Sequence, residues 1–360
     1  MADVTEPEGT ITLEELQLAT RNHGMPLEAL RWPVTPVGLH YVLVHYDIPH
    51  VDAGTWSLEI GGRVTKPLRL TLDDLAARPR HTVVTTMECA GNGRALLEPR
   101  PVSQPWLVEA VGTATWTGTP LAPLLEAAGL ADDAREILFA GLDRGVEGDV
   151  PQRFERSLPV DECLGEDVIL AYEMNGEPLP PQHGFPLRLV VPGWYGMTNV
   201  KWLTSISVTA EPFDGYQQAT AYRLRQQADE PGEPLTRMLP RALMVPPGVP
   251  EFMTRRRFLR VGRHTIDGRA WSGWGDVEAV DVSADGGEHW QPAEIEAGAD
   301  GSRWAWRRWH WVWEAEQPGE YILCCRARDA AGNVQPEGER WNFHGYANNA
   351  VQRLPVTVQS

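Results

Sequence analysis

The sequence predicts an α+β domain over residues 1–237, followed by an all-β domain, a β-sandwich, over residues 238–360. Two observations carry this prediction. Up to about residue 236, helix-start signals alternate with strand-like segments, which is typical of an α+β domain. Four prolines between residues 240 and 250 then mark the entry into a second domain, in which short alternating strands recur between turns. A length of 360 residues is sufficient for two domains.

The first domain mixes short helices with short strands. Thr12 and Glu15 have the spacing of a capping box, which predicts that a helix begins there. Apolar and β-branched runs between proline and glycine positions are typical of strands. We expect helices over residues 12–16, 71–75 and 120–129, and strands over residues 38–46, 56–60, 68–70 and 81–86.

The rhythm of turns in the second domain favours an immunoglobulin-like sandwich. Cys324 and Cys325 lie next to each other in one expected strand, so one thiol should face the core and the other the opposite face. The many tryptophans of this half indicate either a dense core or an interface. The expected strands cover residues 279–283, 304–306, 309–313, 321–327 and 355–358.

Charge and composition exclude several classes of partner. A formal net charge of −17 argues against nucleic acid and anionic membranes, and no apolar run approaches the roughly 18 residues that span a bilayer. The acidic N-terminus shows neither a signal peptide nor a twin-arginine pattern, so we expect a cytoplasmic protein. The four cysteines match no haem-attachment or iron–sulfur pattern, so we expect no haem in this chain.

The most informative segment is Thr-Thr-Met-Glu-Cys-Ala-Gly-Asn-Gly-Arg, residues 85–94. A strand-like run ends at Cys89, and Gly91 and Gly93 would let another group approach the backbone. Arg94 supplies a positive charge that should lower the pKa of the thiol, and the thiolate is the form that binds metals. Taken alone, such a cysteine is more often buried and inert.

This segment resembles the sulfite-oxidase family of molybdenum enzymes, whose Cys-Ala-Gly-Asn segment carries the protein ligand to the metal. The resemblance covers nearly the whole chain, as that family's molybdopterin-binding domain followed by its dimerisation domain. It implies a molybdenum–molybdopterin cofactor with Cys89 as the metal ligand, since a soft thiolate suits such a metal. It also implies a homodimer formed through the second domain.

The resemblance further implies which residues hold the cofactor. Asp143, in Phe-Ala-Gly-Leu-Asp, matches an aspartate that accepts hydrogen bonds from the pterin. His183, Arg188 and Lys201 match residues that clamp the pyranopterin and its phosphate. The implied cofactor-binding residues are Asn22, His23, Cys89, Asp143, His183, Arg188, Asn199, Val200 and Lys201.

At the substrate site the resemblance implies two arginines, a tryptophan and a tyrosine. Arg21 and Arg94 would hold a small anion, and Trp106 would line the pocket. Tyr222 would hydrogen-bond near the transferred oxygen, with Tyr216 as the rival candidate.

Two positions depart from the family pattern. Gly93 stands where an arginine is usual, and Asp276 stands where a Trp-Ser-Gly-Gly-Gly-Arg segment has its arginine. Each lost charge-assisted contact is worth roughly 1.5–3 kcal/mol, which predicts weaker sulfite binding.

The function implied is oxygen-atom transfer that oxidises sulfite to sulfate, with electrons passed to an unidentified external acceptor. One alternative is oxo transfer on another small substrate, such as reduction of a sulfoxide or nitrate. The loss of the second-domain arginine favours that alternative, whereas the retained arginines favour an anion. A second alternative is a non-catalytic cofactor-binding protein, against which the intact Cys89 argues.

Overall fold

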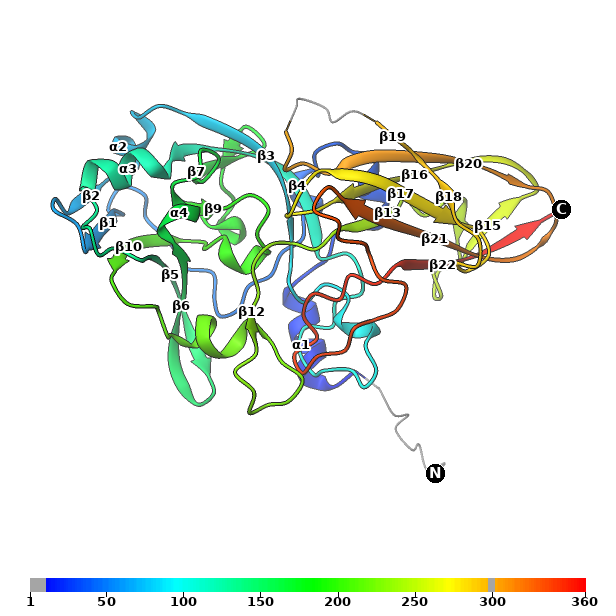
Figure 1. The fold of residues 1–360 in the computed structure, drawn as a ribbon, viewed down its shortest axis with the longest axis horizontal. Coiled ribbons are helices and arrows are strands. Elements are labelled where there is room, and N and C mark those ends of the chain that lie inside the picture. The colour runs from blue at the N-terminus through cyan, green and yellow to red at the C-terminus, as the bar shows by residue number, and fades with distance from the viewer. Residues whose placement is uncertain (1–10, 297–301) are drawn as a thin grey trace.

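The computed structural model describes residues 11–296 and 302–360, which form two regions side by side (Figure 1). Helices and two sheets form one region, and an elongated all-β region forms the other, with the C-terminus at its far end. The predicted α+β domain followed by a β-sandwich is therefore confirmed. Within the described ranges, every helix is too short or too polar to cross a membrane.

The first sheet of the first domain is mixed, in the order β2-β1-β10-β5-β6. β1 runs parallel to β10, and the other neighbours are antiparallel. Leu58 and Ile60 alternate with exposed Glu59, the pattern of a half-buried strand. The strands are β1 (Leu58–Gly62), β2 (Leu68–Leu70), β5 (Glu136–Glu147), β6 (Val150–Pro159) and β10 (Leu203–Thr209).

The second sheet carries the Cys89 segment into the protein. Its order is β3-β4-β7-β8, β9 lies beside β7, and all pairs are antiparallel. The last four residues of β3 are all buried, so the residue that follows this strand begins inside the fold. The strands are β3 (His81–Glu88), β4 (Val111–Pro120), β7 (Ile169–Met174), β8 (Glu177–Pro178) and β9 (Arg188–Val190).

The helices of the first domain are short and are fixed at their ends. The predicted capping box at Thr12 and Glu15 is confirmed, since each residue accepts a backbone N–H of the other. The second helix begins with an equivalent pair, Thr71 and Asp74. The helices are α1 (Leu13–Arg21), α2 (Leu72–Ala76), α3 (Leu121–Ala128) and α4 (Val160–Cys163).

The predicted strand over residues 38–46 is wrong. This segment contains the end of a short helical turn and a single bridge between Val42 and His23. Its backbone is bonded to side chains instead, because the Val44 N–H donates to Asn22 and the Leu43 carbonyl accepts from Lys201. Tertiary contacts override the local β propensity.

The second domain is a sandwich of two sheets. One sheet has the order β13-β16-β20-β19 and the other β14-β15-β22-β21-β17-β18, with a shared core between them. The predicted boundary at residue 237 falls between the small ribbon β11 (Arg223–Leu224) and β12 (Glu233–Pro234) and the first strand of the sandwich. The sandwich strands are β13 (Arg241–Met244), β14 (Val249–Pro250), β15 (Arg257–Arg260), β16 (Gly262–Trp271), β17 (Val277–Ser283), β18 (Gln291–Pro292), β19 (Glu294–Ile295), β20 (Arg307–Ala315), β21 (Gly319–Asp329) and β22 (Gln352–Gln359).

The tryptophans of this half serve both of the expected roles. Trp309, Trp311 and Trp313 alternate along β20 and fill the sandwich core. Trp304 and Trp306 form no strand, which corrects the expectation for residues 304–306. Their indole N–H groups donate to Asp167 and to the Pro33 carbonyl of the first domain, each at 2.7 Å. These five tryptophans therefore form a core and a contact between domains, not an exposed aromatic patch that would drive dimerisation.

The adjacent cysteines of β21 face opposite sides of the strand, as expected, and both are fully buried. Cys325 belongs to the sandwich core. Cys324 points to the opposite face, where the Arg353 guanidinium covers its sulfur at 3.8 Å. The long arginine side chain shields a face that the strand alternation would otherwise leave open.

Candidate active site

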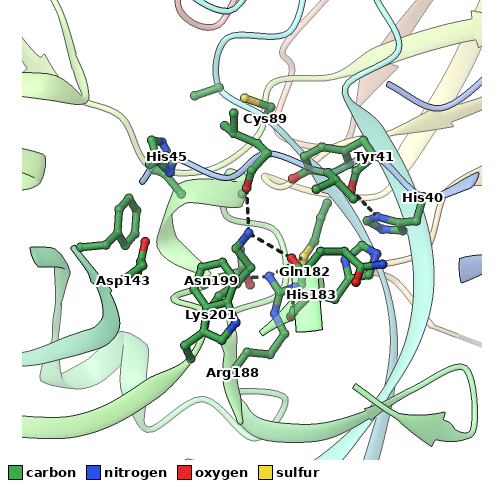
Figure 2. Close-up of a pocket in the computed structure, with 18 of the residues that line it drawn as sticks. His40, Tyr41, His45, Cys89, Asp143, Gln182, His183, Arg188, Asn199 and Lys201 are labelled. Carbon is green, nitrogen blue, oxygen red and sulfur yellow. Dashed lines mark hydrogen bonds between the residues drawn. The ribbon is translucent and has the colours of Figure 1, made fainter. Parts of the chain in front are cut away.

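A cavity opens beside the end of β3, and Cys89 lies on its rim (Figure 2). Its wall is assembled from segments far apart in the sequence, because β3, β5, β9 and the loops around residues 40–45 and 182–202 converge there. The lining residues are His40, Tyr41, Val42, Leu43, His45, Met87, Cys89, Ala90, Asp143, Phe154, Gln182, His183, Arg188, Gly196, Met197, Asn199, Lys201, Trp202 and Tyr222.

The loop after β3 is built around glycines. Gly93 has φ +92°, which a glycine adopts readily. A Cβ atom on Gly91 would lie 2.6 Å from the Arg94 guanidinium, so only glycine lets Arg94 pack across this turn. The turn places the positive charge of Arg94 close to the Cys89 thiol.

The expectation of a lowered pKa at Cys89 is wrong for the protein without its cofactor. Burial raises the pKa of the Cys89 thiol above its ordinary value, although Arg94, the Gly91 amide and the Trp106 indole each act to lower it. Desolvation of the thiolate outweighs the nearby guanidinium. A bound cation would reverse this balance, since a coordinating thiol loses its proton.

Arg188 is a buried positive charge held by neutral groups. Its guanidinium donates to the His183 and Asn199 carbonyls at 3.1 and 3.2 Å, and lies over the Trp116 ring. Burial lowers the pKa of Arg188 to about 10. No carboxylate among the described residues forms an ion pair with Arg188. A buried cation without an anionic partner is costly, so this site favours an anionic ligand.

Lys201 and Asp143 form the opposing pair of charges in the cavity. The Lys201 ammonium donates to the Leu43 and Gln182 carbonyls at 2.7 and 3.2 Å. Burial lowers the pKa of Lys201 to about 7, with Arg188 adding to the effect. Burial also raises the pKa of Asp143 to about 6, against the lowering effect of Lys201. Shifts of this size are typical of functional sites.

Four buried polar side-chain atoms of the cavity residues have no hydrogen-bond partner among the described residues. They are His40 Nε2, Asp143 Oδ1, His183 Nε2 and Arg188 Nε. Burial lowers the pKa of His183 to about 2, so its imidazole is neutral and can donate or accept. An acceptor, a neutral imidazole and a guanidinium match the donors, ring nitrogens and phosphate of a molybdopterin. The residues present therefore fit that cofactor, with Cys89 as the thiolate ligand.

Asn199 and Val200, also expected at the cofactor, lie in the loop that forms one wall. Asn199 lines the cavity, but its amide is used to hold the loop, accepting from the Val191 N–H at 2.7 Å. Val200 is fully buried in the main core and does not line the cavity.

The predicted segment Arg21–Asn22–His23 is not among the residues that line this cavity, and its role at the substrate and the cofactor stays a prediction. Arg21 ends α1 with an exposed side chain that donates to the Tyr46 carbonyl at 2.6 Å. Asn22 is buried and accepts from the Val44 N–H at 2.7 Å, so it supports the wall from behind. His23 is exposed and pairs through its backbone with Val42.

Residues 40–45 form part of the cavity wall, although they were not among the predicted site residues. His40, Tyr41 and His45 line the cavity (Figure 2). His45 is hydrogen-bonded to the Tyr222 hydroxyl. Burial lowers the pKa of His45 to about 3, so its imidazole is neutral. The available signal was a pair of histidines in an otherwise apolar run, which a core strand would rarely tolerate.

The substrate-side candidates are brought together only in part. Tyr222 lines the Cys89 cavity, whereas Tyr216 lines a neighbouring groove. Arg94 is buried and donates to the His344 and Gln104 carbonyls at 2.8 and 2.9 Å. Trp106 is buried in the cluster that contains Cys89.

Tyr346 of the second domain was also missed. The centroid of the Tyr346 ring lies 5.2 Å from the centroid of the Tyr222 ring. The Arg94 guanidinium carbon also lies 5.2 Å from the Tyr346 centroid. No pattern around Tyr346 indicated a position beside the site, because this residue belongs to a domain that was expected only to dimerise. The second domain therefore contributes a side chain next to the site.

The two departures from the family pattern differ in their structural meaning. A Cβ on Gly93 would lie 2.7 Å from the Asn348 carbonyl, so the packing of the second domain excludes an arginine there. Asp276 is exposed, its carbonyl accepts from the Ala330 N–H, and it does not line the Cys89 cavity. The expectation that Asp276 repels an anion in the pocket is not supported by this position.

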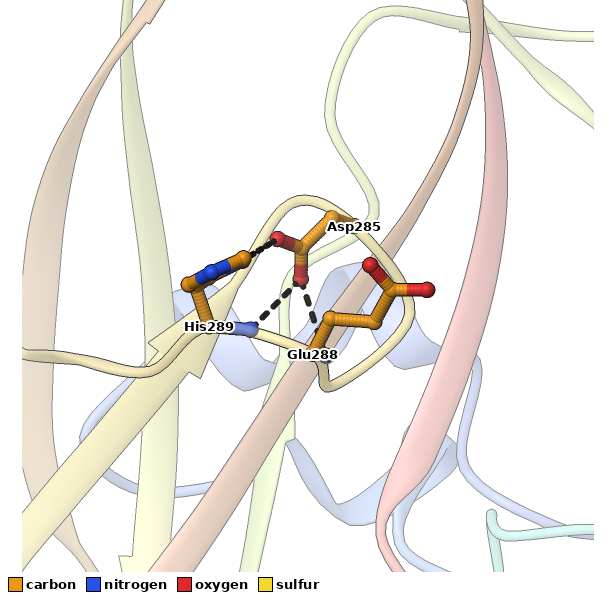
Figure 3. Close-up of side chains that lie close together, drawn as sticks. All are labelled: Asp285, Glu288 and His289. Carbon is orange, nitrogen blue, oxygen red and sulfur yellow. Dashed lines mark hydrogen bonds and ion pairs between the residues drawn. The ribbon is translucent and has the colours of Figure 1, made fainter.

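A second group of potential metal ligands lies on a turn of the sandwich (Figure 3). Asp285, Glu288 and His289 are exposed, and the Asp285 carboxylate accepts from the backbone N–H groups of the other two residues. Hydrogen bonds from the Ser283 hydroxyl and then from the His289 backbone N–H lower the pKa of Asp285, so the low pKa is a feature of the turn.

Comparison with known proteins agrees with this geometry. Residues 45–217 match the oxidoreductase molybdopterin binding domain, and residues 244–359 match the Mo-co oxidoreductase dimerisation domain. Mitochondrial sulfite oxidase of Mus musculus is 36% identical over 90% of this chain and 62% of its own length. Sulfite oxidase of Arabidopsis thaliana is 34% identical over 89% of this chain and 87% of its own. The chain thus spans less than two thirds of the mouse relative's length.

The fold is also similar to a solved structure. The sulfane dehydrogenase SoxCD from Paracoccus pantotrophus superposes with a TM-score of 0.80 and 27% identity. The similarity covers 100% of this chain and 95% of that chain. The arrangement of the two domains is therefore shared, not only the first domain.

Proposed function

Because the chain belongs to the sulfite-oxidase family of molybdopterin oxidoreductases, we propose that it oxidises sulfite to sulfate. The reaction takes one oxygen from water and releases two protons and two electrons, so it requires an external electron acceptor. The observation that supports this most directly is that the Cys89 thiol lines a cavity together with Lys201 and with the buried Arg188, which has no carboxylate partner among the described residues. When bound, the molybdenum–molybdopterin group supplies the oxygen-transfer and redox chemistry.

The chain's own residues bind and orient. His183, Arg188 and Lys201 would hold the anionic end of the cofactor, and Asp143 would accept hydrogen bonds from its ring N–H groups. Cys89 would be the protein ligand to the metal. Asn22 acts indirectly, because it accepts from the Val44 N–H and so holds one wall of the cavity in place.

At the substrate, Arg94 and Tyr222 are the proposed contacts. Arg94 supplies positive charge beside Cys89, and burial raises the pKa of Tyr222 well above its ordinary value, so its hydroxyl stays a donor. The neutral His45 fixes the direction of that hydroxyl. Buried donors of this kind stabilise developing negative charge without reorganisation.

A second candidate, oxo transfer on a less charged substrate such as a sulfoxide, is favoured by one observation. Among Arg21, Gly93, Arg94 and Asp276, Arg94 alone presents a positive charge beside Cys89. A site with one such arginine retains less of its affinity for a dianion.

One preparation tests both candidates. We expect about one molybdenum per chain, because Cys89 is the one proposed protein ligand. We also expect that sulfite reduces a dye acceptor and that Cys89→Ser abolishes this activity. If the second candidate is correct, sulfite will not reduce the dye. A sulfoxide or nitrate will instead oxidise a reduced dye. We further propose a homodimer and a cytoplasmic location, and both stay predictions.

A further inference from the structure

The second domain closes over the loop that carries Cys89. The Ala347 N–H donates to the Ala90 carbonyl at 2.7 Å, and the Asn348 side-chain amide donates to the Gly93 carbonyl at 2.8 Å. The Arg94 guanidinium donates to the His344 carbonyl. Two backbone carbonyls of this turn, those of Ala90 and Gly93, and the Arg94 side chain are therefore bonded to one segment of the second domain, residues 344–348.

A buried charged cluster lies on the other side of the same loop. Glu88, the last residue of β3, is 2% exposed and accepts from the Trp271 indole N–H at 2.9 Å. Its other oxygen accepts from the Asn92 amide at 3.0 Å and pairs with Arg241 at 3.1 Å. Arg241 is also 2% exposed and donates to the Asn348 carbonyl. Arg241 and Trp271 belong to the second domain, in β13 and β16.

This cluster is more elaborate than domain packing requires. A buried carboxylate and guanidinium are costly to desolvate, and apolar residues of similar volume would often be as stable. Glu88 immediately precedes Cys89 in the chain, so bonds to Glu88 also constrain Cys89. Successive side chains of an extended chain point to opposite sides, so anchoring Glu88 toward the second domain directs Cys89 into the cavity.

We propose that Glu88, Arg241 and Trp271 are positioning residues through which the second domain sets the orientation of Cys89 toward the molybdenum. This inference rests on the proposed role of Cys89 as the metal ligand, but not on sulfite as the substrate. Residues that orient a ligand are in general nearly as important as the ligand itself.

The test compares conservative variants at the cluster with matched variants elsewhere in the domain contact. Glu88→Gln removes the charge, and Trp271→Phe removes a single hydrogen bond while keeping the ring. Glu28→Gln is the control for the first, because Glu28 pairs with Arg257 of the second domain at 2.9 Å. Trp306→Phe is the control for the second, because its indole donates to the Pro33 carbonyl.

The first readout needs no turnover. In the full-length chain isolated without cofactor, alkylation of Cys89 by iodoacetamide is followed by mass spectrometry of its peptide. Because a loosened loop opens more often, we expect alkylation about fivefold to tenfold faster in the cluster variants, the factor that loss of one buried hydrogen bond corresponds to. The two controls should match the wild type.

The second readout uses the molybdenum-loaded protein. We expect kcat to fall by about 10- to 100-fold in the cluster variants, the range found for partners of metal ligands, with KM unchanged and with a shifted Mo(V) electron paramagnetic resonance signal. Equal alkylation rates and an unchanged signal in Trp271→Phe and Glu88→Gln would overturn the proposal and leave the cluster a packing feature. If the wild type does not oxidise sulfite, the proposed substrate fails, while the alkylation and resonance measurements still decide this inference.

Discussion

At the scale of single residues, burial controls the chemistry of the cavity. It raises the pKa of Cys89 and Asp143 and lowers the pKa of His183 and Lys201, so burial favours the neutral form of each group. These shifts describe a site without its ligand. An anionic cofactor next to Arg188 and Lys201 would favour their charged forms.

Cys89→Ser tests the ligand. The serine hydroxyl is smaller and harder than a thiolate, so we expect loss of activity with little change in the free energy of unfolding. Molybdenum content is then measured by plasma mass spectrometry alongside chemical denaturation, and metal retained through the pterin is compatible with the prediction. Cys163→Ser, at another buried cysteine, is the control. Full turnover in Cys89→Ser would contradict the assignment.

Asp143→Asn tests the pKa of Asp143. Burial raises the pKa of Asp143 from 3.8 to about 6 in the folded protein. Between about pH 4 and pH 6, the carboxyl group is therefore protonated in the folded state and ionised in the unfolded state. Stability associated with this group is complete below about pH 4 and is lost as the pH rises through about 6. In the cofactor-free protein, the wild type should lose at most about 3 kcal/mol of its free energy of unfolding as the pH rises through this range. Asp143→Asn should not show this decrease, because its side chain does not titrate. Denaturation curves at several pH values would contradict this if wild type and variant run parallel.

At the scale of elements, segments of irregular backbone supply much of the site. The loop over residues 40–45 brings His45 to Tyr222, while Tyr222 follows a short helical turn at Gln217–Ala221. The regular strands β3, β5 and β9 place Cys89, Asp143 and Arg188 around the same cavity. Strands thus place three residues of the cofactor side, whereas His183 and Lys201 of that side and the residues around Tyr222 lie outside strands.

Tyr222→Phe and Tyr216→Phe distinguish the two tyrosines. Tyr222 lines the Cys89 cavity, so losing its hydroxyl should lower kcat/KM for sulfite by about 10- to 100-fold, the value of a hydrogen bond to a charged group. Tyr216 lies in the neighbouring groove, and its variant should stay close to wild type. Steady-state kinetics with a dye acceptor measures both. The reverse order of effects would assign the role to Tyr216.

At the scale of the whole molecule, the two domains are tied together at the site. Trp304 and Trp306 reach from the sandwich to the first domain, and residues 344–348 close over the Cys89 loop. The sandwich is therefore part of the active-site architecture as well as the region that matches a dimerisation domain.

The dimer prediction now depends on other apolar side chains. Val249, Phe252 and Met253, at the turn between β14 and β15, are 66%, 82% and 79% exposed, and exposed apolar groups favour contacts between subunits. We expect a C2 dimer of about 80 kDa, twice the chain mass of 40.1 kDa. Phe252→Asp should weaken it in sedimentation velocity, and Leu16→Asp on α1 is the control. A monomer at micromolar concentration would contradict the dimer, and an unchanged dimer in Phe252→Asp would place the interface elsewhere.

The sequence by itself determined the two-domain order and most helix starts, because these depend on local patterns such as the Thr12 capping box and the strand that ends just before Cys89. The cofactor-side residues Asp143, His183, Arg188 and Lys201 were predicted from the resemblance to a known family, because their local patterns alone do not distinguish them from ordinary polar turn residues.

Only the tertiary structure decided which residues meet. Residues 38–46 have the composition of a strand, yet bonds from Asn22 and Lys201 make them a cavity wall. The contact of Gly93 with Asn348, and that of Tyr346 with Tyr222, join residues from different domains. The physical reason is that the energy of a site comes from contacts between distant segments, whereas a sequence pattern reports only the preferences of neighbours along the chain.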